Sequence, residues 1–432
     1  MRRRCSFFFL RRKENQKRIL YSLELIFAIC IGLVLCGCGA EAEPPPAQEV
    51  LAAVETPEPA AEPEPAPEPE PEPVPEPVPE PDPKKEAVER VLAGMSLEEK
   101  VGQMFFVRCP DRGAVEKVGQ YHLGGYLLFT RDFKDSAGGW LTEQAFTDRI
   151  TGYQAASRIP LLIGVDEEGG TVARASRNPN LFPEKCKSPQ KLFAEGAWEA
   201  IEQDAVDKNS GLLSYGINVN FAPVADVSTD PADFMYDRAF GQDAQATADY
   251  VQTVVKAAGN VSVSDGEACY KIGSVLKHFP GYGNNVDTHT GIAVDERPYE
   301  QFLAEDFLPF QAGIEAGAGS VLVSHNIIQG MDGDLPASLS PEVHRILREE
   351  LGFEGVILTD DLAMDAVESY AKDGSVAVLA ALAGNDMIVT TDFEVQIPLV
   401  IDAVRTGILP EETVDNAVRR TLAWKYDLGL LE

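Results

Sequence analysis

The chain has 432 residues, of which 44% are hydrophobic, and it carries a formal net charge of −32 at pH 7. This length accommodates one large domain with additional segments, or two domains of ordinary size. Proteins that bind nucleic acid through its phosphates present basic surfaces, so such a strongly acidic chain excludes a nucleic-acid partner.

The amino terminus has the pattern of a secretory signal. Residues 1–18 carry eight Lys and Arg, and residues 19–35 are almost wholly apolar. The apolar run ends in Leu-Cys-Gly-Cys, which resembles a bacterial lipobox whose last cysteine, Cys38, is lipidated. We therefore expect residues 1–38 to be a lipoprotein signal peptide and the remainder to be an extracytoplasmic, membrane-anchored lipoprotein. Cleavage before Cys36 and a retained transmembrane anchor are the alternatives.

The next segment is rich in proline and glutamate. Residues 41–84 contain 16 prolines and 13 acidic residues. Such a composition cannot build a core, so we expect residues 39–84 to be a disordered, extended linker. At ~3.1 Å per residue, Pro57–Pro83 would span roughly 80 Å. Residues 84–432 still carry a formal charge of −25.

Cysteines are few in the rest of the chain. Beyond residue 38 only Cys109, Cys186 and Cys269 remain, at irregular spacing. Three cysteines allow one disulfide, but they do not make a disulfide framework.

From Ala87 onward, short apolar runs alternate with longer amphipathic runs. The apolar runs predict buried strands at Gln103–Val107, Gly125–Phe129, Pro160–Val165, Val219–Pro223, Ser274–Leu276, Ser320–Val323, Gly355–Leu358 and Met387–Val389. The amphipathic runs predict helices at Leu141–Ser157, Trp198–Tyr215, Ala244–Ala258, Tyr299–Ala316, Pro341–Leu351, Ser375–Ala383, Val395–Thr406 and Glu411–Tyr426. This alternation indicates a parallel α/β fold, and residues 85–432 are predicted to form one TIM-like (β/α)8 barrel. A doubly wound open sheet is the alternative, but no GxGxxG motif opens any helix.

Polar residues follow five of the predicted strands. These are Asp166-Glu167, Asp226, Lys277-His278, Ser324-His325-Asn326 and Asp360-Asp361. In a barrel the carboxyl ends of all strands meet on one face, where active sites are built. Any one of the aspartates could instead cap a helix. Five polar strand ends together favour the barrel.

The stretch from Lys277 to Gly283 concentrates chemical groups on one loop. Lys277 and His278 lie where a strand ends, and a proline and two glycines then force an exposed turn that leads to Asp287 and His289. The spacing of histidines and carboxylates matches no common zinc motif, so no metal is expected. Several carboxylates on one face without a cofactor motif indicate general acid/base or covalent chemistry on a polyhydroxylated substrate, as in glycosidases.

Four motifs together resemble glycoside hydrolase family 3 in its β-N-acetylhexosaminidase branch, from about Leu92 to Leu431. They are Asp166-Glu167-Glu168-Gly169-Gly170, Asp237-Arg238-Ala239-Phe240, Lys277-His278-Phe279-Pro280-Gly281 with Asp287-Thr288-His289, and Thr359-Asp360-Asp361-Leu362-Ala363-Met364. The resemblance implies a barrel fold and an enzyme that cleaves β-linked N-acetylglucosamine, often from cell-wall fragments. It implies no metal and no organic cofactor.

The resemblance also implies roles for individual residues. Asp360 corresponds to the nucleophile that forms a glycosyl-enzyme, His289 to the general acid/base, and Asp287 to the partner that orients His289. The residues that correspond to sugar-binding groups are Asp166, Arg174, Arg238, Lys277 and His278.

Other functions stay open at this point. A phosphorylase of the same fold is the first alternative, because a neutral histidine does not repel phosphate as a second carboxylate would. A β-glucosidase is another. Outside catalysis, the chain could be a tethered sugar-binding lipoprotein without turnover.

Overall fold

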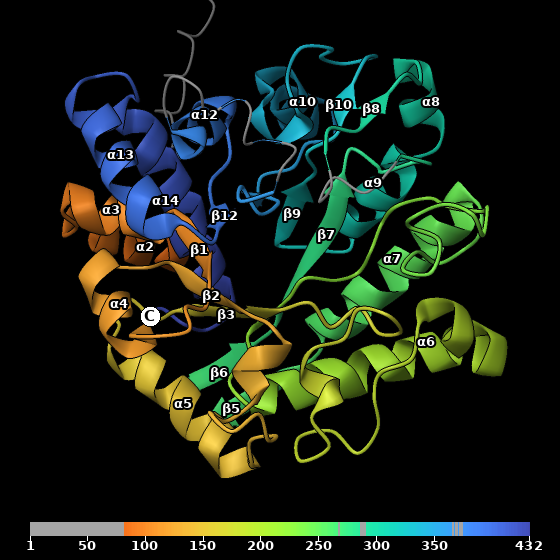
Figure 1. Cartoon of the computed structure of the whole chain (residues 1–432), viewed down its shortest axis with the longest axis horizontal. Coiled ribbons are helices and arrows are strands. Elements are labelled where there is room, and N and C mark those ends of the chain that lie inside the picture. Colours follow the sequence, from red (N-terminus) through yellow and green to blue (C-terminus); the bar gives the residue numbers. More distant parts are fainter. Residues whose placement is uncertain (1–81, 267, 286–290, 365–366, 368–369, 371–374) are drawn as a thin grey trace, which may run out of the picture. The chain divides into compact units, whose positions relative to one another are not determined.

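Eight parallel strands form the centre of the computed structural model, which describes residues 82–432 except 267, 286–290, 365–366, 368–369 and 371–374 (Figure 1). The predicted signal peptide, the lipidation site at Cys38 and almost the whole linker lie outside the described residues, as do Asp287 and His289.

The strands are ordered β11-β9-β7-β4-β3-β2-β1-β12, and every neighbouring pair is parallel. A further parallel bridge between Leu358 and Met387 joins β11 to the segment that enters β12 and closes the ring. Their bounds are β1 Phe105–Arg108, β2 Gly125–Leu128, β3 Leu162–Val165, β4 Val219–Asn220, β7 Gly273–Phe279, β9 Ser320–Val323, β11 Val356–Thr359 and β12 Ile388–Thr390. The predicted barrel is confirmed, and each of the eight predicted strands overlaps one of these.

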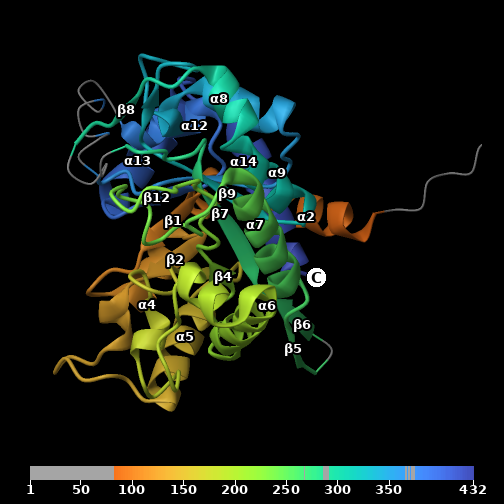
Figure 2. The same cartoon turned by 90° about the vertical axis from the view of Figure 1, so that its right-hand side faces the viewer.

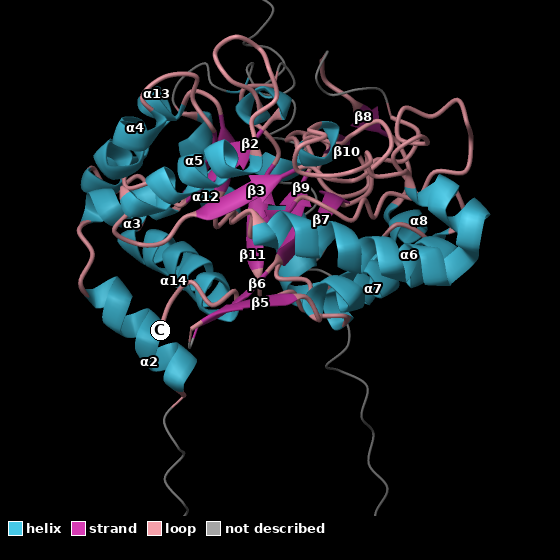
Figure 3. Ribbon diagram, turned by 90° about the horizontal axis from the view of Figure 1, so that it is seen from below, coloured by secondary structure: helices cyan, strands magenta, loops and turns pink. Residues whose placement is uncertain are grey.

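Helices follow the strands and surround them (Figure 3). They are α4 Ala114–Tyr121, α5 Glu143–Ala155, α6 Pro189–Ser214, α7 Ala244–Gly259, α8 Tyr299–Ala304 with α9 Phe307–Glu315, α10 Pro341–Arg345, α12 Val376–Ala383 and α13 Phe393–Arg405. The last helix, α14 Glu411–Asp427, packs against α2 Pro83–Ala93 and α3 Leu97–Gln103. α2 begins at Pro83, inside the segment expected to be linker, because Asp82 caps its first turn.

Local sequence explains these elements. The strand β9 is buried along its whole length, as expected for a parallel strand that helices cover. In α7, the Asp243 side chain accepts a hydrogen bond from Ala246 N at 2.9 Å and so caps the helix.

Four further strands of the described chain lie outside the barrel, and two of them, β8 Val294–Asp295 and β10 Ile327–Ile328, pair in parallel with each other. β5 Ser262–Asp265 and β6 Ala268–Lys271 form an antiparallel hairpin beside the carboxyl terminus (Figure 2), and Lys271 N donates to Leu428 O at 3.1 Å. The hairpin is only partly buried and was not predicted.

Cys109, Cys186 and Cys269 are free thiols, so the single disulfide that their number allows is not formed. None of the helices in the described part of the chain has the length and hydrophobicity needed to cross a membrane.

Candidate active site

A cavity of about 310 Å³ opens at the carboxyl ends of the barrel strands. Its lining includes the predicted nucleophile and all five predicted sugar-binding residues: Asp166, Arg174, Arg238, Lys277, His278 and Asp360. These six residues come from four different strands or the loops that follow them, and the barrel brings them together.

One buried carboxylate links two of the cations. Lys277 Nζ lies 2.6 Å from Asp166 Oδ1 and 2.6 Å from Glu168 Oε1. Arg238 donates to the same Glu168, from Nε to Oε2 at 2.9 Å and from Nη2 to Oε1 at 2.7 Å. Glu168 is almost fully buried, whereas the Asp166 carboxylate borders the cavity. Glu168 therefore holds the two cations in place, and Asp166 can accept hydrogen bonds from a ligand.

The charges in this cluster stabilise one another. Burial favours a higher pKa for Glu168, but the charges of Arg238 and Lys277 outweigh it and hold this pKa far below its usual range. Burial likewise favours a lower pKa for Arg238, and the Glu168 charge reverses that effect and raises it. Glu168 and Arg238 are thus both ionised before any substrate enters.

The orientation of His278 is fixed by two partners. Its Nδ1 lies 2.7 Å from Asp226 Oδ2, and its Nε2 lies 3.2 Å from Arg238 Nη2. A carboxylate can only accept and a guanidinium can only donate, so these contacts assign a neutral imidazole with the proton on Nδ1. Asp226 also accepts from the backbone N of Tyr282 at 2.8 Å, which shows that it supports this loop and does not cap a helix.

The loop after β3 is built on Glu167. Its Oε2 accepts hydrogen bonds from the backbone N of Arg174, Ala175 and Ser176 at 2.8, 2.7 and 3.3 Å. The turn before them requires glycine, because Gly169 has φ 97° and a Cβ there would lie 2.0 Å from the Lys187 carbonyl oxygen. Glu167 is therefore a structural residue that places Arg174.

Asp360 directly follows β11. Its backbone N donates to Val323 O at 3.0 Å, and its Oδ1 accepts from Asp361 N at 2.8 Å. Asp361 faces the turn that follows and accepts from Ala363 N and Thr391 Oγ1. Both aspartates line the cavity, but the Asp361 carboxylate is held by the turn that follows, which leaves Asp360 as the candidate nucleophile.

Arg108 and Phe129 were not predicted to belong to the site, but both lie at the cavity. The Arg108 guanidinium lies 4.3 Å above the Phe129 ring, and the Arg174 guanidinium lies 5.6 Å from the same ring. The buried Nε atoms of both arginines have no hydrogen-bond partner in the described part of the chain. Both guanidinium groups can therefore donate to the hydroxyls of a bound sugar.

A buried ion cluster holds the two segments that flank residues 286–290. Asp295 Oδ2 accepts from Asn285 Nδ2 at 3.0 Å on one side and from Arg297 Nη2 at 2.8 Å on the other. Arg297 Nη1 also donates to Asp306 Oδ2 at 2.7 Å. Gly283 packs so closely on this cluster that a Cβ would lie 2.6 Å from Arg297 Nη2. One cluster thus ties the entry and the exit of the segment that carries Asp287 and His289.

His325 is fully buried and does not belong to the cavity lining. Its Nδ1 lies 2.7 Å from Ser338 Oγ, and its Nε2 lies 3.1 Å from the Asp361 carbonyl oxygen. Among the residues described, no group of three or more His, Cys, Asp or Glu side chains is placed to hold a metal ion.

The model of the glycosyl hydrolase family 3 N-terminal domain matches residues 96–423. The chain belongs to glycoside hydrolase family 3. It is 34% identical over 252 residues to a β-hexosaminidase of Stenotrophomonas maltophilia, covering 57% of this chain and 70% of that protein. It is 30% identical over 346 residues to β-hexosaminidase LpqI of Mycobacterium tuberculosis, covering 77% of this chain and 83% of that protein.

Among solved structures, the glycoside hydrolase family 3 β-N-acetylglucosaminidase of a Paenibacillus species superimposes with a TM-score of 0.67 at 28% identity. The match covers 78% of this chain and 63% of that one, so this chain spans slightly less than two thirds of that structure. These similarities confirm the predicted family and the predicted barrel. They also show that the chain is a glycoside hydrolase.

The residues that sequence reasoning missed share one property. Glu168, Arg108 and Phe129 act through contacts with distant parts of the chain, such as the 70-residue separation between Glu168 and Arg238. A partial signal existed for Glu168, since it belongs to the Asp-Glu-Glu-Gly-Gly motif. No signal in the sequence distinguishes Arg108 from a surface arginine.

Proposed function

We propose that this protein is a retaining β-N-acetylhexosaminidase that hydrolyses terminal β-linked N-acetylglucosamine from cell-wall or related glycans. The observation that carries the proposal is the convergence of Asp360 with five polar side chains in one cavity of about 310 Å³. The β-hexosaminidases and the β-N-acetylglucosaminidase to which the chain is similar support the choice of sugar.

The reaction proceeds in two displacements. In the first, an Asp360 oxygen attacks the anomeric carbon, and the bond to the leaving oxygen breaks as His289 protonates that oxygen. In the second, a water molecule loses a proton to His289 and attacks the same carbon, which releases Asp360 and gives a sugar of unchanged anomeric configuration. Asp287 orients the imidazole and stabilises its protonated form.

The polar cluster binds the sugar that Asp360 attacks. Asp166 accepts from sugar hydroxyls, while Arg174, Arg238 and Lys277 donate to them. His278, with its proton on Nδ1 facing Asp226, accepts from Arg238 at Nε2 and so helps to orient that guanidinium at the cavity. Asp166, Lys277, Arg238 and His278 form one bonded network with Glu168 before binding, so little reorganisation of these groups is needed when the sugar enters.

The test is hydrolysis of 4-nitrophenyl β-N-acetylglucosaminide by the full-length protein, beside the β-glucoside and with and without phosphate. Release that prefers the N-acetyl sugar and is lost in Asp360→Ala supports the proposal. A sugar 1-phosphate product would instead identify a phosphorylase. In His289→Ala, an activated substrate should leave one sugar residue on Asp360, detectable by mass spectrometry, because the second step lacks its base.

We also propose that the enzyme is a lipoprotein anchored outside the cytoplasm through Cys38, with residues 39–82 as a spacer between the membrane and the barrel. The lipobox-like sequence after a basic and apolar amino terminus supports this. Labelled palmitate should be incorporated into the wild type and not into Cys38→Ala. Equal incorporation in both would contradict the assignment.

A further inference from the structure

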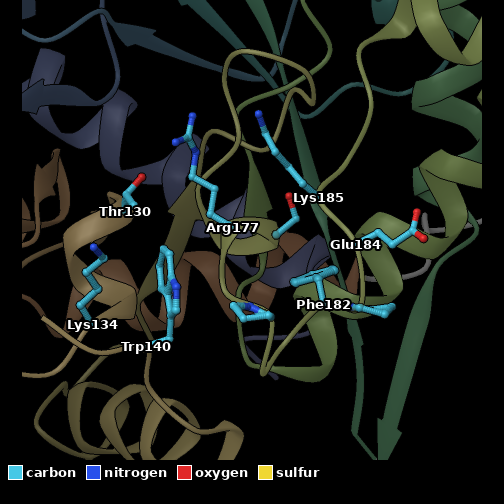
Figure 4. A pocket seen from close by; sticks show the side chains of 10 residues that line it. Thr130, Lys134, Trp140, Arg177, Phe182, Glu184 and Lys185 are labelled. Atoms are coloured by element: carbon cyan, nitrogen blue, oxygen red, sulfur yellow. The ribbon is translucent and has the colours of Figure 1, made fainter.

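A second hollow lies beside the catalytic cavity. It has a volume of about 470 Å³, and its lining includes Thr130, Lys134, Trp140, Arg177, Phe182 and Lys185 (Figure 4). We call it the Trp140 hollow. The segments after β2 and β3 build it, and the same segments contribute Phe129 and Arg174 to the catalytic cavity. Residues adjacent in sequence thus serve the two cavities.

The Trp140 hollow is rich in positive charge. Its lining contains three cations, Lys134, Arg177 and Lys185, and one carboxylate, Glu184. Arg177 donates to the backbone oxygens of Ala173 and Thr171, at 2.8 and 3.2 Å. Within the described residues, none of the three cations forms an ion pair. Residues 84–432 carry a formal charge of −25, so a local excess of unpaired cations is unusual for this chain.

The hollow also has a flat aromatic wall. The Lys134 ammonium lies 4.8 Å from the centre of the Trp140 ring, and Figure 4 shows Trp140 between Lys134 and Arg177. In the same view, the charged ends of Arg177 and Lys185 point in the same direction. An indole beside several donors can hold the apolar face of a sugar ring while the cations bind its polar substituents.

Hydrogen bonds hold the two segments of the hollow together. Asn178 Nδ2 donates to Leu141 O at 2.9 Å, and Asn180 Nδ2 donates to the same oxygen at 3.1 Å. Glu167 fixes the backbone of Arg174 to Ser176 immediately before Arg177. The wall that carries Trp140 and the wall that carries Arg177 are therefore placed before a ligand binds, which lowers the entropic cost of binding.

We propose that the Trp140 hollow binds a negatively charged saccharide unit of the substrate, on the leaving-group side of the bond that is cleaved. This inference rests on the proposed function. The catalytic cavity of about 310 Å³ accommodates one sugar, so the rest of a glycan must extend beyond it. The neighbouring hollow offers an aromatic wall for the next rings and unpaired cations for a carboxylate.

Two trisaccharides that differ in charge test this inference. One is N-acetylglucosamine β-1,4-linked to glucuronic acid and then to N-acetylglucosamine; the other is the neutral chitotriose. Both present the same terminal sugar in the same linkage. The wild type should have the higher kcat/KM for the acidic trisaccharide, and the preference should shrink at high ionic strength because exposed charges are screened.

The double variant Lys134→Gln/Lys185→Gln should lower the ratio of acidic to neutral kcat/KM by about fivefold, the effect of losing two exposed charge contacts. Trp140→Ala should raise KM for both trisaccharides. Lys256→Gln, an exposed lysine on α7, is the matched control and should leave the ratio unchanged.

The outcomes separate this inference from the proposed function. No wild-type preference for the acidic trisaccharide, or a preference that survives the double substitution, would overturn the Trp140 hollow as an anion site while 4-nitrophenyl β-N-acetylglucosaminide is still hydrolysed. If the wild type hydrolyses neither the chromogenic substrate nor either trisaccharide, the proposed function itself is wrong.

Discussion

Lys277 and Glu168 form a 2.6 Å ion pair between side chains of residues that are only 2% and 3% exposed. Glu168 has a second cation, Arg238, as a partner, and Lys277 has Asp166 at the cavity as its other partner, so one buried carboxylate links two cations that are proposed to bind the sugar. A buried charge without its partner is costly, and the sugar site therefore relies on a residue that no substrate is expected to touch.

Glu168→Gln keeps the shape of the side chain and removes its charge. We expect the free energy of unfolding to fall by about 3 kcal/mol, because Lys277 and Arg238 lose their buried counter-ion. The folded-state pKa of Glu168 is depressed, so its stabilisation is complete above its unfolded pKa and is lost only as pH falls through the lower folded pKa. Urea denaturation should thus show the same difference between variant and wild type at pH 7 and pH 5.

Glu195→Gln is the control for that experiment, since Glu195 pairs with Lys187 on the surface. Its free energy of unfolding should match that of the wild type. A Glu168→Gln protein as stable as the wild type would show that the buried cations need no counter-ion.

Asp226→Asn tests the orientation of His278. An amide at this position brings a donor into a site where Asp226 accepts from both the imidazole and the Tyr282 backbone. We expect kcat/KM for the chromogenic substrate to fall about tenfold, equivalent to one buried hydrogen bond of about 1.4 kcal/mol. Asp233→Asn, which affects a carboxylate bonded to Ser228 in the same loop, should retain wild-type kinetics. If Asp226→Asn and Asp233→Asn have equal kinetics, Asp226 does not contribute to the site.

The barrel could be predicted from the sequence because parallel strands covered by helices are continuously apolar, as Val321 to Val323 show. Several elements escaped prediction: α2, α3, α4, the β5–β6 hairpin and the paired strands β8 and β10. In α4 the residues Ala114, Val118 and Tyr121 form an apolar stripe, but the helix has only eight residues, which is too short for a helical period to stand out in the sequence. In the β5–β6 hairpin, β5 is mostly polar and exposed along its whole length, so the hairpin has no buried apolar run that would mark a strand.

Prediction of the site was limited in a different way. Asp166, Lys277 and Asp360 could be recognised because each stands at a strand end within a short motif. Glu168 and Arg108 could not, since a carboxylate or a guanidinium acquires its role from the partners that folding brings to it. The pairing of Asp226 with His278, 52 residues apart, is of the same kind.

Lys425 provides a prediction about pH and stability. It is fully buried on α14, its Nζ donates to Gln103 Oε1 at 2.6 Å, and burial lowers its pKa from 10.5 to about 7. Between these values the unfolded chain binds the proton and the folded protein does not, so stability rises with pH. The rise should approach about 1.4 kcal/mol per pH unit for this single group.

In Lys425→Met this contribution is absent. Urea denaturation from pH 7 to pH 9 should therefore show the wild type gaining stability relative to the variant as pH increases. For Lys256→Met, on the surface of α7, the free energy of unfolding should change with pH as it does in the wild type. Parallel curves for Lys425→Met and the wild type would mean that Lys425 stays protonated in the folded protein.

Arg297 is expected to position the acid/base segment without contacting the substrate. It joins Asp295 and Asp306, and Asp295 in turn holds Asn285, immediately before residues 286–290. Burial raises the pKa of Asp306 to about 7, opposed by the charge of Arg297, so loss of the arginine changes the charge of the whole cluster. Arg297→Gln should then misplace His289 relative to the leaving oxygen.

The dependence on the leaving group distinguishes such a positioning effect from general destabilisation. A glycan leaving group needs protonation, whereas 2,4-dinitrophenolate does not. Arg297→Gln should lower kcat about 100-fold for chitotriose and far less for the dinitrophenyl substrate, since general acid catalysis contributes about that factor. Arg297→Lys should restore part of the activity, and Arg345→Gln, which affects a surface arginine paired with Glu342, should change neither rate. Equal losses on both substrates would show that Arg297 supports the fold and not the proton transfer.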